Sequence, residues 1–245
     1  KNIFAAEFEQ FARGKSEQPA IIDVRSGKTL TYGEFFDLTS AWAGLLTAEL
    51  DKGCDCVMSM LPNSVDQFAL FIGALQAGMN IAPLPTQTTT PEILKFAPQT
   101  KSKVCFIPPH HDELIVKEIK RLGIEPIVVP LDTEKNWLSS KYGTSDTDHD
   151  DRRSSHIYLT TSGTTGDPKV MVIESGRLWA SAKAFVAQFD FLNDECRFLN
   201  NLPMSYLGGL FNLGLIPLAT RGCICIDESF TGRSTLNFWQ TVQRF

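Results

Sequence analysis

The chain has 245 residues and 43% of them are hydrophobic, so it is long enough to bury a substantial core. Its formal net charge of −5 and its isoelectric point near 5.4 leave no basic field to attract nucleic acid or an anionic membrane. No apolar run is long enough to span a bilayer, and the first residues show the pattern of an amphipathic helix rather than a signal peptide. We therefore expect a soluble, cytoplasmic protein without a membrane span.

The predicted elements alternate between helices and strands along most of the chain. Phe4, Phe8 and Phe11 have helical spacing, and Thr31 with Glu34 forms a capping box that opens a second helix. Further helices are predicted after Asn63/Ser64 up to Gly78, around Pro91, and over residues 112–122, 175–189, 210–218 and 236–245. Strands are predicted over residues 20–23, 57–61, around Ile81, and over residues 104–107, 127–129, 157–160, 170–173 and 223–226.

This alternation favours an α/β fold with mostly parallel sheets that are flanked by helices on both faces. The pattern breaks over residues 131–155, which are polar, acidic and poor in branched side chains. We interpret that segment as a surface linker. It divides the chain into a first α/β subdomain, residues 1–130, and the start of a second one, residues 156–245.

The most informative segment is YLTTSGTTGDPK, residues 158–169, which follows an apolar run. Its glycines let backbone N–H groups approach an anion, its hydroxyls add rotatable donors, and Lys169 adds a mobile positive charge. A Walker loop is excluded, because Pro168 precedes the lysine and Val170 follows it. The segment predicts a cradle for polyphosphate; a Ser/Thr/Gly-rich surface turn before a strand is the alternative.

The cysteines and acidic residues do not form a metal-ligand pattern. The six cysteines include two C-x-C pairs, but both pairs lie in apolar runs where buried thiols are expected. The acidic run at residues 146–151 has two arginines directly after it and no ligand spacing, so a solvated charge run is expected. We predict no metal site in the chain itself.

Four segments together resemble the adenylate-forming superfamily of acyl- and aryl-CoA synthetases, nonribosomal adenylation domains and luciferases. TSGTTGDPK at residues 161–169 is similar to the signature TSGTTGxPKG of that superfamily, with Val170 in place of the last glycine. LTYGEF at residues 30–35, residues 70–106 and LPMSYLGGL at residues 202–210 resemble further segments of the superfamily in the same order. The resemblance covers essentially the whole chain.

The resemblance implies ATP-dependent activation of a small carboxylic acid through an acyl-adenylate. A thiol of coenzyme A or of a phosphopantetheine acyl-carrier protein would then take the acyl group. Mg²⁺ would arrive with ATP, and Lys169 would neutralise the departing pyrophosphate as the catalytic residue. The β- and γ-phosphates would be wrapped by Thr161, Ser162, Gly163, Thr164, Thr165 and Gly166. The adenine-binding segment and the C-terminal lid of the superfamily lie downstream of this sequence, so we expect the N-terminal portion of the large domain, inactive alone.

The segment from residue 203 to residue 209 corresponds to the wall of the acyl pocket, which implies substrate binding by Tyr206, Gly208 and Gly209. Tyr206 stands where the superfamily usually has histidine, so any role of that histidine does not carry over. A loop that simply leads into an apolar helix is the alternative for this segment. Two further hypotheses stay open for the chain: a non-catalytic nucleotide- or acyl-binding module on the same scaffold, and a structural domain within a multi-enzyme assembly.

Overall fold

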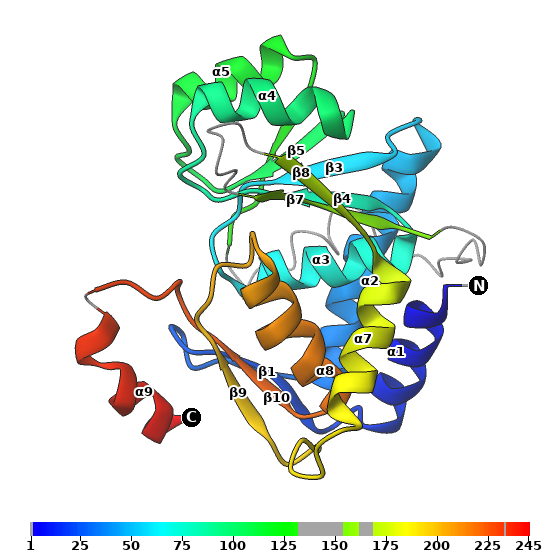
Figure 1. Ribbon diagram of the computed structural model, residues 1–245, viewed down its shortest axis with the longest axis vertical. Helices are drawn as coiled ribbons and strands as arrows, with labels where there is room; N and C mark the ends of the chain where they lie inside the picture. The colour runs from blue at the N-terminus through cyan, green and yellow to red at the C-terminus, as the bar shows by residue number, and fades with distance from the viewer. Residues whose placement is uncertain (1, 132–153, 162–168, 233) are drawn as a thin grey trace.

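Two β-sheets with helices between them and on the outer face of one of them form the molecule (Figure 1). The computed structural model describes residues 2–131, 154–161, 169–232 and 234–245. Its strands are β1 (Pro19–Asp23), β2 (Thr29–Thr31), β3 (Cys56–Ser59), β4 (Asn80–Pro83), β5 (Val104–Ile107), β6 (Glu125–Val128), β7 (His156–Thr161), β8 (Lys169–Glu174), β9 (Arg197–Asn200) and β10 (Cys223–Ile226). Its α-helices are α1 (Ile3–Gly14), α2 (Tyr32–Asp51), α3 (Val65–Ala77), α4 (Thr90–Thr100), α5 (Glu113–Arg121), α7 (Ser175–Val186), α8 (Ile216–Thr220) and α9 (Phe238–Arg244).

The larger sheet has the strand order β6-β5-β3-β4-β7-β8. Neighbouring strands from β6 to β7 are parallel, whereas β8 is antiparallel to β7. The smaller sheet has the order β2-β1-β10-β9, in which β1, β10 and β9 are parallel and β2 is antiparallel to β1. The expected α/β fold with mostly parallel sheets is confirmed.

Each sheet contains strands from both sides of the predicted linker. Strands β7 and β8 join the sheet that β3 to β6 begin, and β1 and β2 pair with β10 near the other end of the chain. The division into residues 1–130 and 156–245 stays a prediction, and the sheets do not separate along it. Most of the linker lies outside the described residues.

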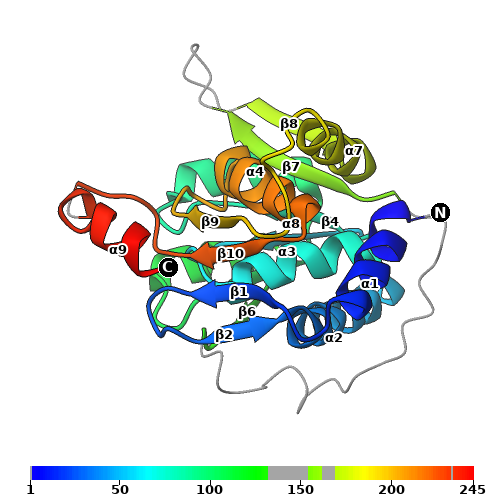
Figure 2. The same ribbon diagram turned by 90° about the horizontal axis from the view of Figure 1, so that it is seen from below.

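Helices α2 and α3 lie between the two sheets, and α4 and α5 cover the outer face of the larger one (Figures 1 and 2). The main core joins the helices to both sheets, and its largest fully buried side chains include Trp42 and Phe68. Gly73 of α3 permits the close contact with α2, because a Cβ there would lie 2.6 Å from the Cβ of Trp42. A second core cluster packs α4 and α5 against the sheet through Ile93 and Ile119.

Local capping signals set the helix starts as the sequence predicts. The Thr31 hydroxyl accepts the N–H of Glu34 at 3.2 Å, and the Glu34 carboxylate accepts the N–H of Thr31 at 2.8 Å. Ser64 caps α3 by accepting the N–H of Gln67, and Gly78 ends that helix with φ at 66°. Asn63, predicted to share this cap, instead turns its side chain toward two other segments.

Three elements differ from the sequence predictions. Strands β2 and β9 were not predicted, because each is short and only partly buried. The helix predicted over residues 210–218 is a π-helix at Gly208–Leu215 followed by α8. Pro217 explains the change of register: it has no N–H to donate to the carbonyl of Leu213, which a continuous α-helix would require.

Candidate functional site

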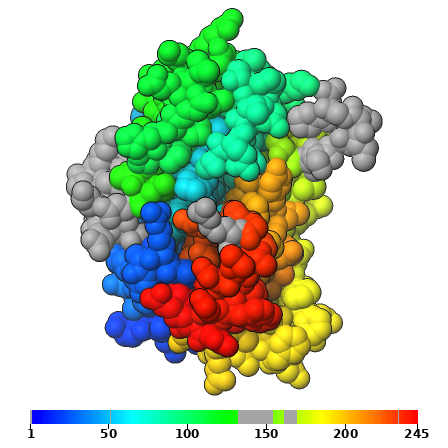
Figure 3. Space-filling view, turned by 90° about the vertical axis from the view of Figure 1, so that its left-hand side faces the viewer, coloured from blue at the N-terminus to red at the C-terminus, as the bar shows by residue number. Residues whose placement is uncertain are grey.

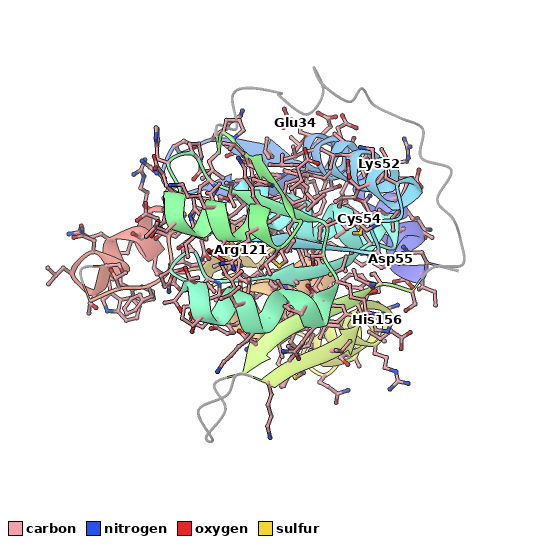
Figure 4. The ribbon with its side chains drawn as sticks, turned by 90° about the horizontal axis from the view of Figure 1, so that it is seen from above. Glu34, Lys52, Cys54, Asp55, Arg121 and His156 are labelled. Atoms are coloured by element: carbon pink, nitrogen blue, oxygen red, sulfur yellow. The ribbon has the colours of Figure 1, made fainter. Side chains whose placement is uncertain are left out.

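A cleft of about 540 Å³ opens where the carboxyl ends of parallel strands from both sheets meet. Its lining follows β1, β3, β4, β9 and β10, and Figure 3 shows this side of the molecule, with α4 and α5 above and α9 below. The amino-terminal edge of the larger sheet, marked by Cys54, Asp55 and His156 in Figure 4, lies on the opposite side from α9. Crevices at the carboxyl ends of parallel strands are the usual ligand sites of open α/β sheets.

The predicted phosphate-binding segment connects β7 to β8 at the same edge. Thr161 pairs with Lys169 across the two strands, so both ends of the connection are held side by side. Ile157 of β7 pairs in parallel with Ile81 of β4, whose following loop lines the cleft. The connection therefore starts at the edge of the sheet where the cleft opens. The predicted residues Ser162, Gly163, Thr164, Thr165 and Gly166 lie outside the described residues, and Lys169 is exposed at the start of β8.

The turn after β9 forms one wall of the cleft. Tyr206 lines it with 40% of its surface exposed, next to the buried side chains of Met204 and Ser205. The predicted residues Gly208 and Gly209 do not line the cleft. At Gly209 a Cβ would lie 2.5 Å from the carbonyl oxygen of Leu202, so this glycine lets the turn fold back onto its own start.

Two asparagines hold this turn; the sequence predicted Asn63 only as a helix cap and did not single out Asn200. Asn63, which follows β3, accepts a hydrogen bond from the N–H of Met204 at 2.9 Å. Asn200, the last residue of β9, is fully buried and donates its amide to the carbonyl of Gly209 at 2.9 Å. A lone asparagine after a strand carries no distinctive sequence signal, because asparagine is common in turns and caps.

Acidic side chains gather along the cleft on the β1 and β10 side. Asp23, Asp227 and Glu228 line it there together with Arg25, whose guanidinium lies 3.9 Å from the Glu228 carboxylate, and Asp66 lines it from the first turn of α3. Burial raises the pKa of Asp227, and the neighbouring charges of Glu228 and Asp23 add to the rise. This part of the cleft repels anions, so it does not itself suit a triphosphate.

Five of the six cysteines are buried thiols. Cys54, Cys56, Cys105, Cys223 and Cys225 are buried, and burial raises the pKa of Cys56 to about 12. The described residues contain no group of three or more histidine, cysteine or acidic side chains arranged to hold a metal ion. The acidic run at residues 146–151 lies outside the part that the structure describes.

Comparison with known proteins assigns the chain to a family. Residues 8–245 match the sequence profile of the family described as AMP-binding enzyme. The chain belongs to the AMP-binding enzyme family. The resemblance drawn from TSGTTGDPK and its flanking segments is thereby confirmed, and the family match extends over the cleft and both sheets.

Curated relatives within the AMP-binding family include CoA ligases and nonribosomal peptide synthetases. The long-chain-fatty-acid–CoA ligase FadD13 of Mycobacterium tuberculosis is 27% identical over 199 residues, which are 78% of this chain and 38% of the ligase. The nonribosomal peptide synthetase fmqA of Aspergillus fumigatus is 27% identical over 212 residues, 84% of this chain and 5% of the synthetase. The chain thus spans less than half the length of either relative.

Solved structures support the same fold. The inhibitor-bound N-terminal domain of FACL13 from Mycobacterium tuberculosis matches 98% of this chain and 60% of its own length, with a TM-score of 0.78 at 22% identity. ATP-bound MatB from Rhodopseudomonas palustris matches 98% of this chain and 48% of its own, with a TM-score of 0.77 at 21% identity. Among the described residues, no helix is both long and apolar enough to cross a membrane.

Proposed function

We propose that the protein to which this chain belongs activates a small carboxylic acid with ATP. The carboxylate oxygen attacks the α-phosphorus, a new O–P bond forms, and the bond to the departing pyrophosphate breaks. A thiol then attacks the carbonyl carbon of the acyl-adenylate, a C–S bond forms, and AMP leaves. Because the relatives include both CoA ligases and nonribosomal peptide synthetases, we propose either coenzyme A or a phosphopantetheine carrier protein as the source of that thiol.

The observation that carries this proposal is the pairing of Thr161 with Lys169 at the edge of the sheet where the cleft opens. The first and last residues of the TSGTTGDPK motif are thereby held side by side at the edge where the cleft opens. Family membership supports the same assignment.

In the proposed reaction the chain positions anions and stabilises their charge. Lys169 offsets the negative charge that develops on pyrophosphate as it leaves. The donors proposed to bind the β- and γ-phosphates are the backbone and hydroxyl groups of Thr161, Ser162, Gly163, Thr164, Thr165 and Gly166. Mg²⁺ bound to the nucleotide would supply further charge neutralisation, and we assign no protein ligand to it.

The acid is proposed to bind against the turn that carries Tyr206. The ring of Tyr206 offers an apolar wall and its hydroxyl offers one hydrogen bond, while Gly208 and Gly209 act by allowing the turn to close.

Exchange of labelled pyrophosphate into ATP by the full-length protein tests the proposal. A panel of short aliphatic, aromatic, hydroxy, dicarboxylic and amino acids is screened, and acid-dependent exchange is expected with at least one class. Absence of exchange with every acid, while a known CoA ligase is active in the same assay, contradicts the proposal.

A non-catalytic nucleotide- or acyl-binding module is the second candidate, and Tyr206 in place of the usual histidine favours it. Isothermal titration of the full-length protein with ATP, without acid, separates the two. Binding of ATP in a protein that shows no exchange with any acid supports the module.

A further inference from the structure

The side chain of Asn63 connects three segments that are far apart in the sequence. Its amide nitrogen donates to the carbonyl of Leu202 at 2.8 Å and to the carbonyl of Asp227 at 3.3 Å. Its amide oxygen accepts the N–H of Met204 at 2.9 Å. The loops that follow β3, β9 and β10 are thereby tied to one carboxamide at the edge of the cleft.

This set of partners requires an asparagine. Two carbonyls need donors and one N–H needs an acceptor, and a primary carboxamide supplies both from one planar group. Aspartate of the same size offers acceptors only, so it would keep the contact with Met204 and repel the carbonyls of Leu202 and Asp227. Glutamine is longer by one methylene, and alanine makes none of the three bonds.

Asn200 holds the other end of the same turn. Its amide nitrogen donates to the carbonyls of Gly209 and Leu213, each at 2.9 Å. Gly209 lies at the start of the π-helix and Leu213 near its end, where Pro217 has no N–H to donate to the carbonyl of Leu213. The turn is thus held before Tyr206 by Asn63 and after it by Asn200.

The turn at residues 202–206 is further held by a backbone hydrogen bond and by burial. The N–H of Tyr206 donates to the carbonyl of Pro203 at 3.2 Å, and Met204 is buried. Tyr206 itself remains 40% exposed and lines the cleft. The backbone that carries it is therefore fixed, whereas its side chain faces the space where a ligand would lie.

We propose that Asn63 is a positioning residue that sets the place of Tyr206 and thereby the affinity of the cleft for the acid. Its assignment to acid recognition rests on the proposed function. Asn63 acts through the turn at residues 202–206. A misplacement of that wall should affect the binding of the acid and leave the binding of ATP unchanged, because among the described residues Asn63 makes no hydrogen bond to β7 or β8, whose ends Thr161 and Lys169 are held by their own strand pairing.

The test uses the full-length protein with Asn63→Asp and Asn63→Ala. Asn193→Asp is the matched control, because Asn193 is an exposed loop residue whose side-chain oxygen accepts from the nearby N–H of Glu195 and the thiol of Cys196, and aspartate keeps both acceptor contacts. Asn200 is fully buried, so replacing it would destabilise the fold as well as displace the turn. Asn63 is therefore the better residue with which to test positioning. Circular dichroism and thermal unfolding first establish that each variant is folded.

The first readout is amide hydrogen exchange in peptides covering residues 202–206. Both Asn63 variants are expected to exchange about tenfold faster there than the native protein, and Asn193→Asp is expected to match it. Unchanged protection in both Asn63 variants overturns the positioning role. This readout does not depend on any enzymatic activity.

The second readout separates the two substrates in pyrophosphate exchange. In the Asn63 variants the KM for the acid is expected to rise about 10- to 100-fold, with the KM for ATP within about twofold. Equal rises for both substrates, or no rise for the acid despite faster amide exchange, overturn the assignment to acid recognition. If the native protein exchanges with no acid, the proposed function fails, and the amide exchange alone decides whether Asn63 holds the turn.

Discussion

Thr161 and Lys169 face each other as the final pair of the β7–β8 hairpin. The strand pairing continues from there to His156 and Glu174, so the hairpin is held in register along its whole length. The TSGTTGDPK motif of the AMP-binding family is therefore bounded on both sides by residues whose backbones are fixed relative to each other.

Replacing Lys169 with alanine is expected to lower the rate of pyrophosphate exchange by about 100-fold or more, because the charge that offsets pyrophosphate is lost. The free energy of unfolding is expected to change little, since Lys169 is exposed at the start of a strand. Lys117→Ala, on the exposed face of α5, is the control for a lost surface charge. A Lys169→Ala protein with native exchange rates contradicts the catalytic role.

Gly209→Ala is expected to destabilise the protein by about 1–3 kcal/mol, because the new Cβ would lie 2.5 Å and 2.6 Å from the carbonyls of Leu202 and Pro203. Gly176→Ala provides the matched control. Its Cβ would meet no atom within 4 Å, and alanine is the better helix former, so stability should stay level or rise by up to about 1 kcal/mol. Urea unfolding of the two variants measures both effects, and equal unfolding midpoints contradict the steric argument.

The cap of α4 is expected to make stability depend on pH. Hydrogen bonds from the N–H and hydroxyl of Thr89, at 2.7 Å and 2.8 Å, hold the pKa of Glu92 below its usual value of 4.5. A lowered pKa in the folded state stabilises the protein above pH 4.5, and the gain is lost as pH falls through the folded value. The difference in unfolding free energy between the native protein and Glu92→Gln should therefore be larger at pH 7 than at pH 3.5. A difference that does not shrink on acidification contradicts this assignment.

Tyr206→Phe is expected to raise the KM for the acid about five- to tenfold, because the hydroxyl that would bond the acid is removed while the ring stays. The KM for ATP should not change. Steady-state pyrophosphate exchange measures both constants. An unchanged KM for the acid would assign Tyr206 a packing role at the cleft without a polar contact.

The thiols are expected to react in two groups with Ellman's reagent. Cys196 is the one cysteine of the six that is not buried, so it should react first in the native protein. The other five should react only as the protein unfolds in urea. Rapid reaction of more than one thiol under native conditions contradicts the packing of β3, β5 and β10.

Much of the fold could be predicted because its signals are local. The capping box at Thr31 and Glu34, the cap at Ser64 and the left-handed Gly78 each determine a helix end within a few residues. The pairing of β1 with β10 could not be predicted in this way, since it joins residues near opposite ends of the chain. The antiparallel direction of β8 was missed as well, because an apolar run does not reveal the direction in which its strand will pair.

The candidate phosphate-binding segment is marked in the sequence by a motif, and its site residues stay a prediction, whereas no motif marks the asparagines that hold the turn beside the cleft. The segment ending at Lys169 has an ordered composition that identifies the family, whereas Asn63 and Asn200 act through partners that are distant in sequence. Pro217 provides one local signal that points to a donor such as Asn200, but it can be interpreted only once the structure is known. Pro217 lies four residues after Leu213, and that spacing shows that a carbonyl in the helix needs a donor from elsewhere.

The pairing of β1 with β10 also bears on how the chain is made. On the ribosome, β1 (Pro19–Asp23) emerges long before β10 (Cys223–Ile226), the inner strand of the smaller sheet with which it must pair. Until then Ile21 and Ile22, both buried in the finished fold, have no native strand to pair with on that side. The smaller sheet is therefore completed only after residue 226 has been made, and a nascent chain stalled before residue 223 presents an unpaired apolar strand to chaperones.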